Sequence, residues 1–240
     1  MSEALLSYRV RVSPKGRSIR LRVTLRHGLE VVVPRGYDVR RIPDLLQRKR
    51  HWVRTAMERA EANRKFFEPE PVWRVPMQIK LQAIGAVWHV TARATEADWV
   101  AVREIGPSQL LLFGAIDNET ACRAALARWL MRQTREHLVP RLEAISKKTE
   151  LNHRMVLIKR QRTRWASCSR RGTISLNAKL LFLPPKVVEY VMIHELCHIA
   201  EMNHTKRFWQ LLERHYPHYR PVDAALREMW KTVPRWAMTP

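Results

Sequence analysis

Residues 184–209 decide the fold, and they read PPKVVEYVMIHELCHIAEMNHTKRFW. The two leading prolines suit the first turn of a helix, where a missing backbone N–H leaves no hydrogen bond unmade. The residues that follow are apolar almost all round, which is typical of a buried helix. This helix nevertheless carries His194, Glu195 and His198. Buried polar side chains cost free energy unless they are paired or bind a metal ion, so all three need an explanation.

The spacing of these three residues indicates a zinc site. His194 and His198 are four residues apart, so they are neighbours on one helix face with Cβ atoms about 5–6 Å apart. Two imidazoles at that separation can both reach one ion at Zn–N distances of about 2.0–2.1 Å. Glu195 lies about 100° further round the helix, beside the metal without pointing straight at it. The pattern predicts Zn²⁺ as the cofactor and Glu195 as the general base that deprotonates a metal-activated water.

A catalytic zinc ion needs a third protein ligand and an open position for water. His204 follows His198 by six residues, and on an unbroken helix these would rotate it by about 240°, away from the metal. We therefore predict that the helix ends between them, with Asn203 in a left-handed turn that returns His204 to the ion. His204 is favoured because it lies just past this break. Glu213 and Glu228 are the alternative third ligands.

The net charge indicates a polyanionic partner. The chain has 44 Lys and Arg residues against 22 Asp and Glu, which gives a formal charge of +22, far more than solubility requires. Trp165 could stack on bases, and Arg20, Arg22 and Arg26 form a basic stripe. DNA or RNA is therefore a candidate partner, and the alternative is a solvated surface with some structural arginines. Six cations lie just before the helix that carries the histidines: Lys159, Arg160, Arg162, Arg164, Arg170 and Arg171.

The rest of the chain alternates between strand and helix patterns, which predicts an α+β fold. Residues 8–34 and 77–115 read as strands, and residues 38–63 read as a helix. A long helix is expected over residues 118–148, with Asp117 as its N-cap and Pro140 as a kink or break.

These patterns divide the chain into two expected domains. The first is a β-rich basic domain with one helix over residues 1–116, and the second is the metal-binding domain over residues 117–240. A further helix is expected over residues 221–230 near the end of the chain.

Composition indicates an intracellular, cytoplasmic protein without a membrane partner. The chain is 46% apolar over 240 residues, enough for a sizeable core. Its three cysteines show no paired spacing, which favours a reducing compartment over a disulfide framework. No apolar stretch is long enough for a signal peptide or for a membrane span of about 18 residues.

Four segments together resemble the YgjP-like metal-dependent hydrolases, which are similar to the SprT-like and WSS-type zinc metallopeptidases of the zincin clan. The resemblance implies a zincin catalytic domain with a long supporting helix, a small sheet and the H-E-x-x-H helix. It also implies zinc on His194, His198 and His204 with Glu195 as general base. Ala166 and Thr205 depart from the usual Gly and Ser of the family. The segments are R-T-R-W-A-S-C-S (162–169), G-T-I-S-L-N (172–177), V-M-I-H-E-L-C-H (191–198) and N-H-T-K-R-F-W (203–209).

These observations predict a zinc-dependent metallopeptidase that acts on proteins or peptides. The basic segments suggest that its targets include proteins bound to nucleic acid. Candidate donors to the oxyanion are Arg164, Asn177 and His215, each of which also has an ordinary structural role available. The alternative functions are a basic nucleic-acid-binding protein and a zinc hydrolase of a non-peptide bond.

Overall fold

The computed structural model describes residues 7–14, 16, 18–24, 28–57 and 73–238. The chain forms two compact units, Met1–Val72 and Trp73–Pro240. This division falls well before residue 116, where the sequence patterns placed the domain boundary. The difference arises because the strands between residues 78 and 114 share one core with the helices that follow them.

The first unit is a small mixed sheet with helices on its apolar face. Its strands are β1 (Tyr8–Ser13), β2 (Arg20–Thr24) and β3 (Gly28–Pro34), in the order β1-β3-β2, with β1 parallel and β2 antiparallel to β3. A 3-10 turn η1 (Val39–Arg41), helix α1 (Ile42–Arg48) and helical residues 50–57 follow. The predicted helix over 38–63 is thus interrupted near residue 49; its residues 58–63, like Arg26, lie outside the described residues.

The second unit begins with a four-stranded sheet. Its strands are β4 (Gln78–Leu81), β5 (Ala86–Ala94), β6 (Val100–Gly106) and β7 (Gln109–Gly114), and a 3-10 turn η2 (Gln82–Ile84) joins β4 to β5. The order is β4-β5-β7-β6, in which only β5 and β7 run parallel. One face of this sheet supplies Ile79, Leu110 and Leu112 to the same core as the helices that follow. The sheet therefore belongs to the second unit.

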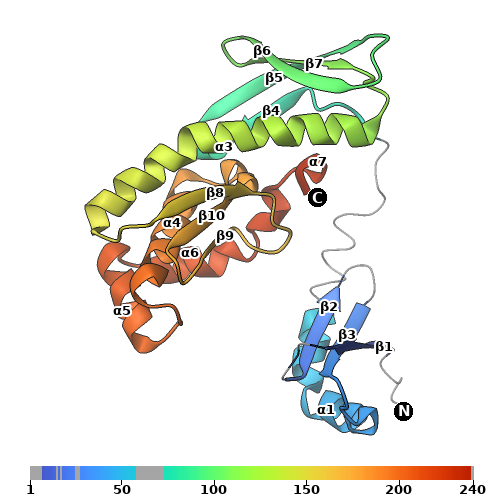
Figure 1. Ribbon diagram of the computed structural model, residues 1–240, viewed down its shortest axis with the longest axis vertical. Coiled ribbons are helices and arrows are strands. Elements are labelled where there is room, and N and C mark those ends of the chain that lie inside the picture. The colour runs from blue at the N-terminus through green and yellow to red at the C-terminus, as the bar shows by residue number, and fades with distance from the viewer. Residues whose placement is uncertain (1–6, 15, 17, 25–27, 58–72, 239–240) are drawn as a thin grey trace. The chain divides into compact units, whose positions relative to one another are not determined.

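Helix α3 (Glu119–Thr149) is the long supporting helix. Figure 1 shows it running between the four-stranded sheet and the remaining helices of this unit. Its N-cap is Asn118, whose side chain accepts a hydrogen bond from the backbone N–H of Ala121 at 3.0 Å, so the prediction of Asp117 was wrong by one residue. Pro140 lies inside the helix without ending it, because it is on the solvent side, where water can satisfy the carbonyl that it leaves unpaired.

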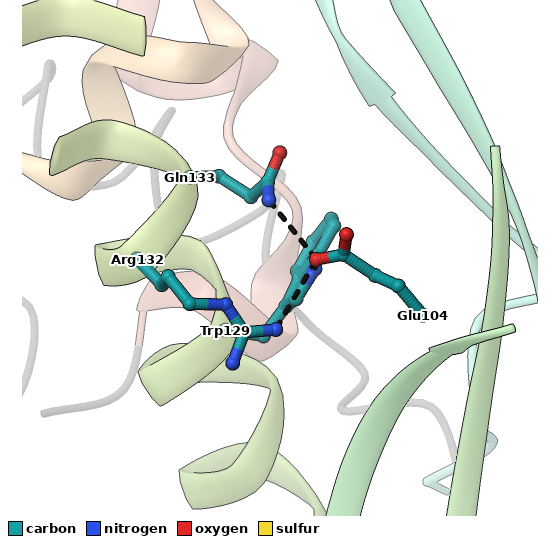
Figure 2. A network of polar contacts seen from close by, with 4 residues as sticks. All are labelled: Glu104, Trp129, Arg132 and Gln133. Carbon is teal, nitrogen blue, oxygen red and sulfur yellow. Dashed lines mark hydrogen bonds and ion pairs between the residues drawn. The ribbon is translucent and has the colours of Figure 1, made fainter. Parts of the chain in front are cut away.

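One carboxylate joins β6 to α3 (Figure 2). Glu104 Oε1 accepts hydrogen bonds from Trp129 Nε1 at 2.9 Å and from Arg132 Nη2 and Gln133 Nε2 at 3.1 Å each. Trp129 and Gln133 are buried, so Glu104 satisfies donors that would otherwise have no access to water.

The third sheet and the remaining helices complete the unit. Strands β8 (Met155–Lys159), β9 (Ala166–Cys168) and β10 (Thr173–Asn177) have the order β8-β10-β9, with β8 parallel and β9 antiparallel to β10. The chain continues through η3 (Ala178–Phe182), α4 (Pro185–Ala200), α5 (Lys206–His215), α6 (Tyr219–Leu226), η4 (Met229–Thr232) and α7 (Arg235–Met238). The predicted α+β class is confirmed, and the helix expected over 221–230 is divided between α6 and η4. Within the described ranges, no helix has the length and apolar character needed to cross a bilayer.

Candidate metal centre

Three histidines converge where α4 ends. His194 and His198 lie on α4, in which ten of the 16 residues are buried. The helix ends at Ala200 because the next residue, Glu201, is extended (φ −130°), and its N–H still bonds to Cys197 O at 2.9 Å. The expected left-handed turn at Asn203 is wrong, since Asn203 has no positive φ. The helix stops at the extended Glu201, and the bends at Met202 and Asn203 then bring His204 back towards α4.

The imidazole nitrogens are close enough to share one ion. His204 Nε2 lies 3.0 Å from His194 Nε2, and the ring centroids of the three histidines are 4.7–5.0 Å apart. One nitrogen from each ring lies within 4.8 Å of the other two, and no other group of three such ligands occurs among the described residues. Two nitrogens on one tetrahedral zinc ion would be about 3.3 Å apart at Zn–N distances of about 2.0–2.1 Å. The donor set therefore fits a divalent metal ion such as zinc.

Hydrogen bonds donated by the second ring nitrogen hold two of these imidazoles in the orientation that a metal needs. His198 Nδ1 donates to the carbonyl oxygen of Glu201 at 3.0 Å, which leaves Nε2 with its lone pair. His194 Nδ1 lies 3.4 Å from the hydroxyl of Tyr190, and this hydroxyl donates to Asp223 Oδ1 at 2.7 Å. Because the Tyr190 proton is committed to Asp223, the Tyr190 oxygen is free to accept from His194 Nδ1–H. Metal-binding histidines commonly have such partners.

Aromatic rings pack against the three histidines. Phe208, on α5, is fully buried and has ring centroids of His194, His198 and His204 within 4.6–4.9 Å of its own. Trp209 stacks on His204, with centroids 5.5 Å apart, and on Tyr219 from α6, with centroids 5.2 Å apart. Phe208 and Trp209 both lie on α5, which begins two residues after His204.

Burial favours the neutral form of the two imidazoles on α4. The pKa of His194 is lowered to about 4, first by burial and then by repulsion from His198 and His204. Burial also lowers the pKa of His198. Only a neutral imidazole has a lone pair to give to a metal, so both rings are available as ligands at pH 7.

Glu195 is a buried carboxyl beside this cluster. It is 8% exposed, and burial raises its pKa to about 7, while a hydrogen bond from the Cys168 backbone and the charge of Arg164 oppose that rise. Cys168 ends β9, so the sheet edge and α4 meet at Glu195. The carboxyl is thus a group that can exchange a proton near neutral pH in the metal-free protein.

The alternative third ligands are engaged elsewhere. Glu213 forms an ion pair with Arg220 at 3.5 Å, and Glu228 forms one with Lys231. Neither joins the three histidines in a group that could hold an ion, as far as the described ranges extend.

The three candidate oxyanion donors differ in their burial and in their hydrogen-bond partners. Asn177 is fully buried, and its amide nitrogen donates to the carbonyl oxygens of Gln161 at 2.8 Å and Arg164 at 2.7 Å, so no donor is left for a substrate. Arg164 is exposed and near enough to affect Glu195. His215 is the last residue of α5, eleven residues beyond His204.

The six cations around the third sheet do not form one patch. Arg170 and Arg171 lie in the turn between β9 and β10, whereas Lys159, Arg160, Arg162 and Arg164 lie at the other end of β10, roughly 13 Å away along its five residues. Trp165 is not available to bases, because it is buried and stacked on Trp230 with centroids 3.8 Å apart.

Sequence reasoning did not identify Tyr190 or Asp223. Tyr190 precedes His194 by four residues and therefore lies on the same helix face, which was a readable signal. Asp223 is 33 residues beyond Tyr190 on another helix, and no local pattern connects the two.

Comparison with known proteins agrees with a metal-dependent hydrolase. The family model described as "YgjP-like, metallopeptidase domain" matches residues 17–229. The chain belongs to this family of metallopeptidases. No curated protein matches it.

Two solved structures are similar over part of the chain. One is the metallopeptidase zymogen abylysin of Pyrococcus abyssi (29% identity, TM-score 0.33, 38% of this chain and 90% of that one). The other is the metallopeptidase zymogen jannalysin of Methanocaldococcus jannaschii (23% identity, TM-score 0.33, 38% of this chain and 93% of that one).

Proposed function

We propose that this metallopeptidase is a zinc enzyme in which His194, His198 and His204 hold the ion and Glu195 is the general base. The observation that carries the proposal is the convergence of three imidazole nitrogens within 4.8 Å of one another, beside a buried carboxyl. A bound zinc ion would supply the Lewis acidity that makes water nucleophilic near pH 7 and polarises the scissile carbonyl.

Residues of the chain carry out the proton transfers and hold the substrate in place. Glu195 accepts a proton from the attacking water and returns it to the leaving amine. The Cys168 backbone hydrogen bond holds the Glu195 carboxyl in place for both transfers. Strand β9 pairs with β10 on one side, and no described strand pairs with its other side. An extended peptide adding to this edge would pass directly beside Glu195.

Two substitutions separate metal binding from proton transfer. We expect Glu195→Gln to abolish peptide hydrolysis while zinc remains stoichiometric by elemental analysis. We expect His204→Ala to lower the zinc content itself. Glu189→Gln is the matched control, because Glu189 lies on the same helix, is half-exposed and pairs with Arg141 at 3.8 Å. Full hydrolysis by the Glu195→Gln variant would rule out the base, and stoichiometric zinc in the His204→Ala variant would rule out the third ligand.

We further infer that the enzyme associates with nucleic acid, so that its substrates include proteins bound there. The support is the cationic loop of Lys159, Arg160, Arg162 and Arg164. Lys179 packs beneath it, fully buried, with Nζ donating to Gln161 O at 3.0 Å. Its pKa is lowered to about 8, first by burial and then by the charges of Arg160 and Arg162, which lie near it. Lys159→Gln with Arg162→Gln should weaken DNA binding and reduce its salt dependence; unchanged binding would exclude the loop.

A further inference from the structure

The two faces of the first unit's sheet have opposite character. Residues that are direct partners on neighbouring strands point to the same face. On β3, Leu29, Val31 and Val33 point towards α1 and form the core of this unit together with residues of the helices. The intervening positions therefore form the opposite face: Arg9 and Arg11 on β1, Glu30 and Val32 on β3, and Arg20 and Arg22 on β2. We call this set the arginine face.

Its four arginines flank the central strand in two pairs. Arg11 and Arg20 are the partners of Val32, which is only 3% exposed although it lies on the face away from the core. The aliphatic parts of these two side chains therefore cover Val32 and leave their guanidinium groups in water. Arg9 and Arg22 are the partners of Glu30, and all four arginines are exposed.

The charges on this face are unbalanced. Glu30 is its one acidic residue among the strand positions whose side chains are described, and it pairs with Arg11 at 3.4 Å. Four arginines and one glutamate leave a net charge of +3 on this face. Arginines on one strand are two residues apart, roughly 7 Å, and the two outer strands are roughly 9.6 Å apart. The result is a regular array of cations on one face of the sheet.

We propose that the arginine face binds the phosphate backbone of nucleic acid. Guanidinium groups donate paired hydrogen bonds that match phosphate oxygens. A regular array of separate cations suits a polymer with a regularly repeated charge, whereas a small anion would need converging donors. The inference rests on the nucleic-acid association proposed above for its class of partner, and it assigns that partner to a surface in the first unit.

The test compares two sets of substitutions with equal charge. The first is Arg9, Arg11, Arg20 and Arg22 to Gln. The control is Arg35, Arg48, Lys49 and Arg50 to Gln, which removes four exposed charges from the same unit outside the strands. Binding of fluorescent single-stranded and duplex DNA and of RNA is followed by anisotropy between about 50 and 200 mM salt. Each lost phosphate contact on duplex DNA lowers the slope of log K against log salt by about 0.9.

We expect the first set to lower the slope by about 3 and to weaken binding roughly tenfold or more, with a smaller change in the control. Equal losses in both sets would overturn the proposal, as would binding of polyglutamate in place of oligonucleotides. If removal of the cover over Val32 unfolds the unit, Arg9→Gln with Arg22→Gln tests the same face and leaves Arg11 and Arg20 in place. Substitution of all four by Lys should keep most of the salt slope.

The outcome is distinguishable from a failure of the earlier proposals. Peptide hydrolysis without nucleic acid should be unchanged in every one of these variants, since none alters the metal centre. Loss of DNA binding in the Lys159 and Arg162 variant alone would locate the association on the loop and overturn the arginine face.

Discussion

Replacing Tyr190 by Phe tests whether the Tyr190–Asp223 pair orients a metal ligand. The change removes one oxygen atom and keeps a buried ring that packs against His194 and Tyr216. It deletes the 2.7 Å hydrogen bond to Asp223 and the 3.4 Å contact with His194 Nδ1. His194 would then be free to rotate or to adopt the other tautomer.

The expected magnitude follows from these two contacts. A hydrogen bond to a charged group contributes about 1.5–3 kcal/mol, and Asp223 is only half-buried, so we expect the metal-free protein to lose about 1.5–2 kcal/mol of unfolding free energy. Loss of the outer partner of a metal-binding histidine costs about 10–100-fold in metal affinity. The 3.4 Å contact is long, so we expect the lower end, about tenfold.

The assay is competition for zinc with a chromophoric chelator, paired with urea unfolding of the metal-free protein. Tyr216→Phe is the control, because its hydroxyl donates to Lys186 O at 3.2 Å and touches no histidine through that group. Its zinc affinity should stay within about twofold of the wild type. If Tyr190→Phe lowers stability but leaves zinc affinity unchanged, the pair is structural and the reasoning is refuted.

Three further outcomes are expected. Glu104→Ala should lower the unfolding free energy by about 2–4 kcal/mol in urea titrations, because two buried donors lose their acceptor; a loss below about 1 kcal/mol would contradict this. Phe208→Leu should weaken zinc binding in the chelator assay, since the three imidazoles lose the ring beneath them; equal affinity would show that their positions are set elsewhere. Because the pKa of Lys179 is lowered from 10.5 to about 8, the unfolded chain binds more protons there between these values, so its contribution to stability rises with pH. Relative to Lys179→Met, the wild type should gain on the order of 3 kcal/mol in unfolding free energy between pH 7 and 11, and parallel profiles would contradict the burial of a charged lysine.

The convergence of the three histidines was largely predictable because its signal is local. A buried helix with imidazoles four residues apart leaves few chemical explanations, and the six residues after His198 force the helix to end. How it ends was not predictable. An extended Glu201 followed by bends at Met202 and Asn203 returns the chain without a left-handed residue, and the sequence does not distinguish this from a left-handed Asn203.

The parts that failed depend on contacts between distant residues. The boundary expected at 116 followed a change from strand to helix pattern, but Glu104 on β6 binds Trp129 on α3, and such pairings leave no trace in either segment. The basic residues near β10 are close in sequence, yet the antiparallel turn carries Arg170 and Arg171 to the opposite end of the sheet. The burial of Lys179 could not be predicted from the sequence, because its partners are a backbone carbonyl and the face of Trp230.

Because α3 packs against structure on two sides, it limits how this protein can be shortened or recombined. One side of the helix is covered by β6 and its neighbours, and the other side supports the segment that carries the histidines. A fragment that starts at residue 117 would expose Trp129 and Leu126 to water and would be prone to aggregate. Exchange of segments with related chains is therefore expected to preserve folding only where residues 73–238 are kept as one block.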